Sequence, residues 1–342
     1  MLQFGPVATG AAVTWHPSIR GSRACAEPDY RMNYTDIIKE VGRGKNGATD
    51  LDQNTAYTLY GDMLDGRVPE LELGALLVAF RIKGESEAEM LGFHQAMQAH
   101  MGRLQPPAGK PLPVVISSYN GARRQANLTP LLALLLAREG LPVLVHGPLA
   151  DPKRVTTAQV FAELGVPVCD SLAQAQARLD AGQVAFVTPR VLSSGLDALL
   201  ELRWRLGVRN STHTLAKLAD PFGGDALKIV SVTHPDYISR MGSLFIAARL
   251  RAMLSRGTEG EVYANPKRCP QLDFFADGEH RVLVEAEEGS IGVVPVLPES
   301  MDAAVTARWI EQALAGAVPI PAPILTQVQC CLVGAGVKSQ LD

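Results

Sequence analysis

The sequence predicts an α/β protein, with a small N-terminal helical domain followed by a larger α/β domain whose mostly parallel central sheet is covered by helices. Two observations lead to this prediction. Between residues 33 and 101 the apolar residues recur at helical spacing, and no strand-like alternation interrupts them. After the proline-rich linker at 105–113, short apolar runs alternate with helical segments, which is the pattern of parallel strands buried on both faces.

Four short helices are expected in the N-terminal part. The first, opened by Tyr34, follows the i, i+3, i+4, i+7 rule and stops at Gly42, a residue type that commonly ends helices. The fourth opens with Ser86 and Glu89, which have the spacing of a capping box. Residues 32–104 are therefore expected to form the helical domain.

The rest of the chain, residues 105–191 and 220–342, is expected to form the α/β domain. Helices at about 192–219 interrupt it and are expected to return to the helical domain, closing a cleft. Residues 1–31 are expected to be a flexible N-terminal extension, since they show no regular pattern. Strands are expected at 113–117, 141–147, 166–170, 184–189, 227–235 and 280–289. The helices between and after them are expected at 128–140, 157–165, 171–182, 237–257, 302–316 and 324–336.

Net charge, cysteine spacing and the length of the apolar runs exclude several classes of protein. The net charge of −3 does not indicate a globally basic nucleic-acid binder, but it allows a local basic patch. The five cysteines are odd in number and have no C-x-x-C spacing, which indicates free thiols in a reducing cytoplasm. No apolar run reaches the roughly 18 residues of a membrane helix. We therefore expect a cytoplasmic protein with no membrane partner and no metal site.

The segment SSYNGARRQANLTP, residues 117–130, joins an expected strand to an expected helix start, where α/β proteins often hold a phosphate. Phosphate loops are usually rich in glycine, whereas this loop has only Gly121 and carries Arg123 and Arg124. Asn127 precedes the helix and can cap it. The residues fit either an anion site built from side chains or a solvated turn, and they exclude a Walker-type loop.

Two further basic segments follow. Lys153 and Arg154 come after the next expected strand. The carboxyl ends of parallel strands share one edge of the sheet, so these residues are expected to converge with the arginine loop. His146, at the end of that strand, is expected to be a packed or hydrogen-bonded histidine and not a catalyst.

The segment ELRWRLGVRNSTHTLAKLADP, residues 201–221, concentrates positive charge on an acidic chain. A continuous helix would place four of its basic residues on one face, although Gly207 and Asn210 should bend it. A phosphate track and a solvated helix face both stay open. We expect Trp204 to pack in the core, with base stacking as the alternative. The basic residues of this segment are Arg203, Arg205, Arg209, His213 and Lys217.

Glu259 and Glu261 form an acidic pair in a late loop. In an extended segment the two carboxylates would face one side and could hold Mg²⁺ through oxygen ligands. An acidic loop beside Lys267 and Arg268 is the favoured interpretation.

Several long segments resemble one known group of proteins. They are SYNGARRQANLTPLLALLL at 118–136, RWRLGVRNSTHTLAKLADPF at 203–222 and GTEGEVYANPKRCPQ at 257–271. From Met32 onward the chain resembles the anthranilate phosphoribosyltransferases of glycosyltransferase family three, a fold of the phosphoribosyltransferase and nucleoside phosphorylase type. It is most similar to a branch of that group described as binding DNA and RNA.

The resemblance implies a degenerate substrate pocket. The enzymes carry Gly-Thr-Gly-Gly-Asp where this chain has Ser118 to Gly121, and their magnesium-binding Asp-Glu pair falls on Gly260 and Glu261. Lost glycines and a lost metal carboxylate both count against the transfer reaction, so no catalytic residue is expected. The vestigial phosphate and substrate pocket would comprise Asn120, Gly121, Asn127, Thr129, His146 and Gly147.

The resulting hypothesis is a sequence-tolerant binder of DNA and RNA that forms a homodimer through its helical domain and uses no cofactor. The alternative is a pentosyltransferase with an altered substrate, which would use phosphoribosyl pyrophosphate and Mg²⁺. In the first hypothesis, phosphates would be contacted by Arg203, Arg205, Arg209 and Lys217, with the track extended by Arg123, Arg124, Lys153 and Arg154.

Overall fold

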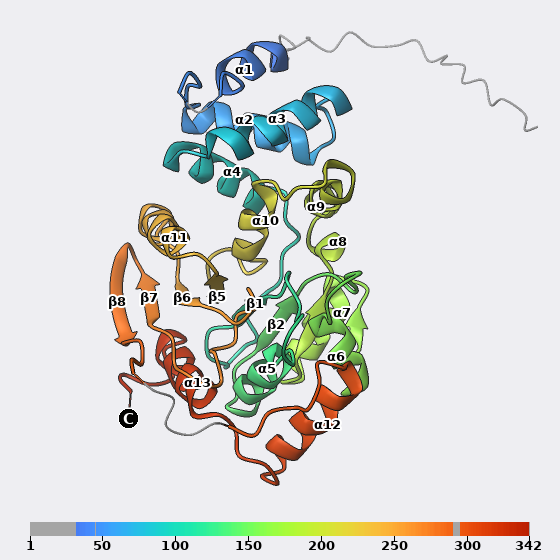
Figure 1. The fold of residues 1–342 in the computed structure, drawn as a ribbon, viewed down its shortest axis with the longest axis vertical. Coiled ribbons are helices and arrows are strands. Elements are labelled where there is room, and N and C mark those ends of the chain that lie inside the picture. The colour runs from blue at the N-terminus through green and yellow to red at the C-terminus, as the bar shows by residue number, and fades with distance from the viewer. Residues whose placement is uncertain (1–31, 45, 290–294, 342) are drawn as a thin grey trace, which may run out of the picture. The chain divides into compact units, whose positions relative to one another are not determined.

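The chain begins as a bundle of short helices. The structure is a computed structural model and describes residues 32–44, 46–289 and 295–341, so the extension expected at 1–31 lies outside the described residues. The capping box expected at the fourth helix is present, with Ser86 and Glu89 bonding to each other's backbone N–H groups. The first helices are α1 (Tyr34–Val41), α2 (Gln53–Leu64), α3 (Glu70–Lys83) and α4 (Glu87–Ala99), as Figure 1 shows.

The α/β part is built on an eight-stranded sheet with the order β3-β4-β2-β1-β5-β6-β7-β8. All neighbours from β3 to β6 pair in parallel, which confirms the mostly parallel sheet. The strands β7 and β8 add an antiparallel edge. The bounds are β1 (Val114–Ser117), β2 (Val143–His146), β3 (Val168–Cys169), β4 (Ala185–Val187), β5 (Leu227–Val232), β6 (Ala252–Arg256), β7 (Leu272–Ala276) and β8 (Glu279–Val284).

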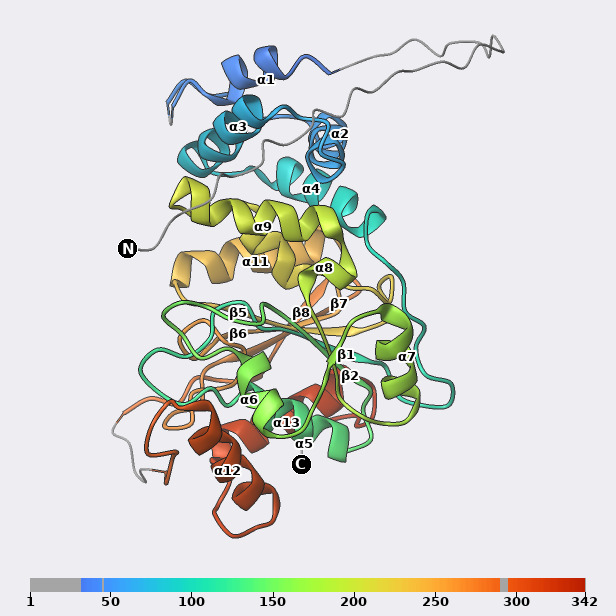
Figure 2. The ribbon, with the colours of Figure 1, turned by 90° about the vertical axis from the view of Figure 1, so that its right-hand side faces the viewer.

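Helices cover both faces of this sheet, which is why its central strands are buried throughout. In Figure 2, α5, α12 and α13 lie on one side, while α9 and α11 lie on the side of the helical bundle. The bounds of these and the remaining helices are α5 (Thr129–Arg138), α6 (Thr157–Glu163), α7 (Leu172–Asp180), α8 (Pro189–Leu192), α9 (Ser194–Leu206), α10 (Thr212–Leu215), the 3₁₀ turn η1 (Ala216–Leu218), α11 (Pro235–Ala247), α12 (Ala303–Leu314) and α13 (Ala322–Gly334).

The single helix expected at 237–257 is wrong. The helix α11 ends at Ala247, and Arg249 adopts a left-handed conformation with φ of 52°. A non-glycine residue in this conformation breaks helical hydrogen bonding. The apolar residues that follow become β6, a strand flanked by β5 and β7 and buried except at its last residue. The antiparallel strand β7 was not expected at all.

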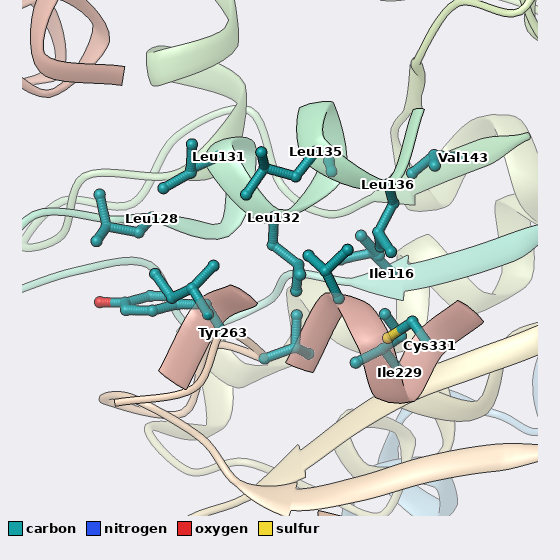
Figure 3. Close-up of a cluster of buried hydrophobic side chains, with 14 of the residues drawn as sticks. Ile116, Leu128, Leu131, Leu132, Leu135, Leu136, Val143, Ile229, Tyr263 and Cys331 are labelled. Atoms are coloured by element: carbon teal, nitrogen blue, oxygen red, sulfur yellow. The ribbon is translucent and has the colours of Figure 1, made fainter. Parts of the chain in front are cut away.

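A core cluster lies between the sheet and α5 and α13. Leu132 and Leu136 of α5 pack towards Ile116 and Ile229 of the sheet, and all four side chains are fully buried or nearly so (Figure 3). Cys331 of α13 lies in the same cluster, and the cysteines in the described part of the chain are buried free thiols. Apolar burial of this kind contributes roughly 25 cal/mol per Å².

The helices α8 to α10 connect the bundle with the sheet. Thr212 of α10 accepts a hydrogen bond from the buried Tyr60 hydroxyl of α2 at 3.0 Å. The bundle and the sheet belong to one compact unit that begins at Tyr34. The division at residue 104 therefore stays a prediction. Among the described residues, no helix is both long and apolar enough to span a membrane.

Candidate functional site

A buried carboxylate fills the loop that follows β1. Glu261 has no exposed surface, and its Oε1 accepts the backbone N–H groups of Asn120 at 2.9 Å and Gly121 at 2.6 Å. Its Oε2 accepts the hydroxyls of Ser118 at 2.6 Å and Thr129 at 3.0 Å. Converging N–H and O–H donors at a strand end and helix start form the kind of site that binds a phosphate. Here the protein's own carboxylate takes that place.

A second carboxylate caps the next part of the same loop. Glu259 accepts the backbone N–H of Arg123 at 2.5 Å and that of Arg124 at 3.0 Å and 3.1 Å, to its two oxygens. It stands in a tight turn closed by two hydrogen bonds between Thr258 and Glu261. The turn places Glu259 at φ 53° and Gly260 at φ 91°. A left-handed glutamate is a strained choice, and it directs both carboxylates at the loop.

These contacts decide between the two interpretations of the acidic pair. Both oxygens of Glu261 already accept two protein donors each, so the residues present do not fit a bound Mg²⁺, which needs carboxylate oxygens free for coordination. Within the described part of the chain, no three metal-ligating side chains gather. Glu259 and Glu261 therefore close the loop after β1, and their contacts count against the magnesium interpretation.

The residues assigned to the vestigial pocket come together around this loop. The Asn127 side-chain oxygen accepts the N–H of Thr129, the first residue of α5, at 3.1 Å. Gly121 has φ of 67°, and an added Cβ would lie 2.9 Å from the Val155 carbonyl. At Gly147 a Cβ would lie 1.9 Å from the Ser118 carbonyl. The two glycines thus permit close backbone packing between the loops after β1 and β2.

His146 is packed and hydrogen-bonded, as expected. It is fully buried, its Nδ1 lies 2.8 Å from the Tyr119 hydroxyl, and its Nε2 has no partner among the described residues. Burial lowers the pKa of His146 to about 4, with the Asp220 carboxylate opposing the shift. The imidazole is therefore neutral at physiological pH.

The basic loops after β1 and β2 converge, as the sequence predicted. Ala122 and Val155 bridge the two loops through paired backbone hydrogen bonds of 2.9 Å. The Arg154 guanidinium donates to the Gly121 carbonyl at 3.2 Å and is partly buried. Exposed basic side chains stand on both sides of this bridge: Arg123, Arg124 and Lys153.

The predicted basic row on one helix face is not formed. The helix α9 ends at Leu206, and Gly207 adopts φ of 72°, so the following residues leave its axis. Lys217 is the clearest departure, because its ammonium group is buried and donates to the Ser231 carbonyl at 2.7 Å. Burial lowers the pKa of Lys217 to about 8, with Glu261 opposing and Arg209 adding to the shift. Lys217 is not at the surface.

The three arginines of this segment have different surroundings. Arg205 is exposed and pairs with Glu70 of α3 through contacts of 3.1 Å and 3.2 Å. Arg209 is largely buried, which lowers its pKa, and the charges of Arg203 and Arg154 add to that shift. Arg203 keeps about a quarter of its side chain exposed and lies 3.5 Å from Asp151. Arg203 and Arg209 therefore lie near the loop after β2, together with the carboxylate of Asp151.

Trp204 is at the surface, so the expectation of core packing is wrong. About half of the residue, 51%, is exposed, and the Arg203 guanidinium lies 4.1 Å from its ring centroid. This is the geometry of a cation–π contact. The ring borders a pocket of about 360 Å³ that lies between α9 and the loops after β1, β2 and β4. The carboxyl edge of a parallel sheet is where α/β proteins bind ligands.

The sequence interpretation missed the acidic wall of this pocket. Asp197 and Glu201 line it together with Trp204, and the spacing of 197, 201 and 204 places all three on one face of α9. The i, i+4 and i+7 spacing of these three residues in the sequence could have indicated that they share one helical face. The pocket is also lined by Tyr119, Asp151, Arg190, Arg203 and His213.

Comparisons with known proteins agree with this architecture. A family model described as the helical bundle domain of a glycosyl transferase family matches residues 35–101. The chain is 54% identical over 306 residues to the uncharacterized protein YbiB of Escherichia coli K12, covering 89% of this chain and 95% of that protein. It is 30% identical over 260 residues to an anthranilate phosphoribosyltransferase of Methylocella silvestris, covering 76% and 70%.

Solved structures agree as well. The fold resembles the anthranilate phosphoribosyltransferase of Thermus thermophilus with a TM-score of 0.67 and 20% identity, over 90% of this chain and 91% of that one. The phosphoribosyltransferase fold expected from the sequence is thereby confirmed. The chain belongs to the family that contains YbiB and the anthranilate phosphoribosyltransferases.

Proposed function

We propose that this protein binds single- and double-stranded nucleic acid, DNA and RNA alike, with little sequence preference, and does not transfer a phosphoribosyl group. Phosphates would contact the exposed basic side chains on the loops after β1 and β2 and along α9. We expect the protein to need no cofactor for this binding and to act in the cytoplasm. The side chains assigned to phosphate contact are Arg123, Arg124, Lys153, Arg203 and Arg205.

One observation carries the proposal: Trp204 is half-exposed beside Arg203, at the mouth of a pocket in a region rich in arginine. An exposed aromatic ring among cations is the combination that binds single strands, because the cations follow the phosphates and the ring stacks on a base. Each stacked base contributes about 1–3 kcal/mol, and phosphate contacts carry no sequence information.

The alternative, a pentosyltransferase with an altered substrate, rests on the fold and on sequence identity of about 30% to anthranilate phosphoribosyltransferases. Phosphoribosyl pyrophosphate would have to displace Glu261 from four donors and Glu259 from two backbone N–H groups. The second anionic substrate of such a reaction, an aromatic acid, would meet Asp197 and Glu201 on the pocket wall. The negative charge of such a substrate and those of the two carboxylates would repel each other. Binding of a nucleic-acid backbone outside the pocket meets neither obstacle.

We further propose that the protein forms a homodimer through its helical bundle. Leu71 and Ile82 of α3 are 82% and 60% exposed. They are eleven residues apart, so they lie on the same helical face and form an apolar stripe that a second copy would cover. Sedimentation of a variant with Leu71→Glu and Ile82→Glu should show a monomer, and an unchanged mass would contradict this interface.

The function is tested by titrating labelled single-stranded DNA, duplex DNA and RNA at several salt concentrations. Five phosphate contacts on duplex DNA predict a slope of log K against log salt of about −4 to −5, and about −3 to −4 on a single strand. Duplexes of different sequence should bind with similar affinity. A slope near zero, or no binding at low salt, would overturn the proposal.

A further inference from the structure

Acidic and basic side chains both line the pocket under α9, and this mixture restricts what can bind there. Asp197 and Glu201 line the pocket, whereas Arg190 and Arg203 also border it. The two carboxylates repel a phosphate, so we expect the backbone of a bound strand at the basic side chains of the loops after β1 and β2 and of α9, and not beside Asp197 and Glu201. On a nucleic-acid strand, the group that can bind beside these carboxylates is therefore an uncharged base that presents N–H donors.

The side chains of Asp197 and Glu201 make no hydrogen bond and no ion pair within the described residues. Asp197 is the half-buried one of the two, whereas Glu201 is exposed. Burial raises the pKa of Asp197, with the Arg190 charge opposing, because no donor compensates for the lost hydration. His213, which lines the same pocket, has a buried Nε2 that is also without a partner among the described residues. A polar ligand would satisfy both groups.

Trp204 provides the stacking surface at the mouth of the pocket. It lies one to two turns beyond Asp197 and Glu201 on the same face of α9. A base stacked on its ring would present an edge towards the two carboxylates. Unpaired bases are read in this way, by stacking and by hydrogen bonds to the Watson–Crick edge.

We propose that this pocket captures one unpaired guanine of a bound single strand, with Trp204 stacked on the base and the Asp197 carboxylate accepting its N1–H and 2-amino N–H. Guanine is the base whose Watson–Crick edge carries two adjacent donors that match the two oxygens of a carboxylate. Cytosine and adenine offer one amino group beside an acceptor nitrogen, and thymine and uracil offer a single N–H between two carbonyls. This inference rests on the proposed function and adds a base preference to it.

The test compares three labelled 12-nucleotide strands in wild-type protein: all thymine, one central guanine, and one central inosine, which lacks the 2-amino group. The guanine strand should bind about tenfold more tightly than either of the others, the usual effect of a hydrogen bond to a charged acceptor. It should also quench tryptophan fluorescence, and Trp204→Phe should remove most of that quenching. Because the comparison uses wild-type protein, it does not depend on the folding of a variant.

Asp197→Asn is the matched variant, since it keeps the shape of the side chain. It should abolish the difference between guanine and inosine and leave binding of the thymine strand within about twofold. Glu163→Gln, an exposed carboxylate of α6 outside the pocket, should keep the tenfold preference. Equal affinities for the three strands with a steep salt slope would overturn the base assignment and leave the proposed function standing. No binding of any strand at low salt would overturn both.

Discussion

Two polar regions lie at the same edge of the sheet, and they differ in whether their groups have partners within the chain. The loop after β1 keeps converging donors, but Glu261 and Glu259 bond to them from within the chain. The pocket under α9 has an exposed ring, Trp204, and a half-buried carboxylate, Asp197, that has no partner among the described residues. The backbone donors of the loop after β1 have partners within the chain, whereas the Asp197 carboxylate and Nε2 of His213 in the pocket have none among the described residues. A ligand therefore gains more at the second region, because it meets groups that need partners.

The internal carboxylates also suit the function that we propose for this fold. Side-chain carboxylates are the partners of the backbone donors, so the loop is held by contacts within the chain. Each such hydrogen bond to a charged acceptor contributes about 1.5–3 kcal/mol. The arginines Arg123 and Arg124 then need not enclose a ligand, and they extend towards solvent.

The largest effect is expected from reversing the exposed charges. Replacing Arg123, Arg124 and Lys153 with Glu should weaken binding of every nucleic acid at low salt by roughly a hundredfold or more and reduce the duplex salt slope by about 3. A matched variant carries the same replacements at Lys110, Arg138 and Arg308, exposed positions outside the basic loops, and should bind normally. Equal losses in both variants would show that net charge alone governs binding.

The closed loop should depend on Glu261 for stability. Glu261→Gln removes the charge and turns one acceptor into a donor that faces existing donors. The free energy of unfolding should fall by about 2–4 kcal/mol, as measured by urea denaturation. Nucleic-acid affinity of the folded variant should change little. A stability loss below about 1 kcal/mol would mean that the loop does not need its internal carboxylate.

Buried neutral histidines should make the fold sensitive to acid. Burial lowers the pKa of His146 and of His94 to about 4, below the value of about 6.5 expected in the unfolded chain. Between pH 6.5 and 4 the unfolded chain binds protons that the folded chain does not, so stability is complete above pH 6.5 and falls as the pH drops. From pH 7 to pH 5 the loss should be about 2 kcal/mol per histidine. The variant His146→Gln lacks one of these titrating groups, so its loss of stability between pH 7 and pH 5 should be smaller by about 2 kcal/mol.

The smallest effect concerns the strained turn. Glu259→Ala removes the capping carboxylate and keeps a side chain at φ 53°, whereas Glu259→Gly removes both the carboxylate and the strain. The glycine variant should be more stable than the alanine variant by about 1 kcal/mol in the same denaturation assay. The opposite order would indicate that the turn changes its conformation in solution.

Much of the fold could be predicted from the sequence because its signals are local. Helical periodicity and the capping box at Ser86 located the bundle, and apolar runs located the parallel strands. The long helix expected at 237–257 failed because one residue, Arg249, leaves the helical conformation, and its sequence carries no glycine or proline signal there. The strand β7 has no alternating pattern, since four of its five residues are buried.

The candidate site was harder to predict because its contacts join segments distant in sequence. Glu261 meets Gly121 across 140 positions, and no local pattern reports that contact. Lys217 is buried for the same reason, since Ser231 of β5 accepts its hydrogen bond. The exposure of Trp204 depends on which face of α9 turns towards the sheet. Because the sequence of α9 is rich in both leucine and arginine, it does not show which face is buried.

The central claim is that the phosphates of a nucleic acid bind to the basic side chains of the loops after β1 and β2 and of α9, and not in the loop that Glu261 fills. Isothermal titration calorimetry with phosphoribosyl pyrophosphate and Mg²⁺, beside a titration with a thymine 12-mer at the same low salt, tests it most directly. The structure predicts saturable heat with the oligonucleotide and no micromolar binding of phosphoribosyl pyrophosphate. Micromolar binding of phosphoribosyl pyrophosphate in the presence of Mg²⁺ would contradict the claim and revive the transferase alternative.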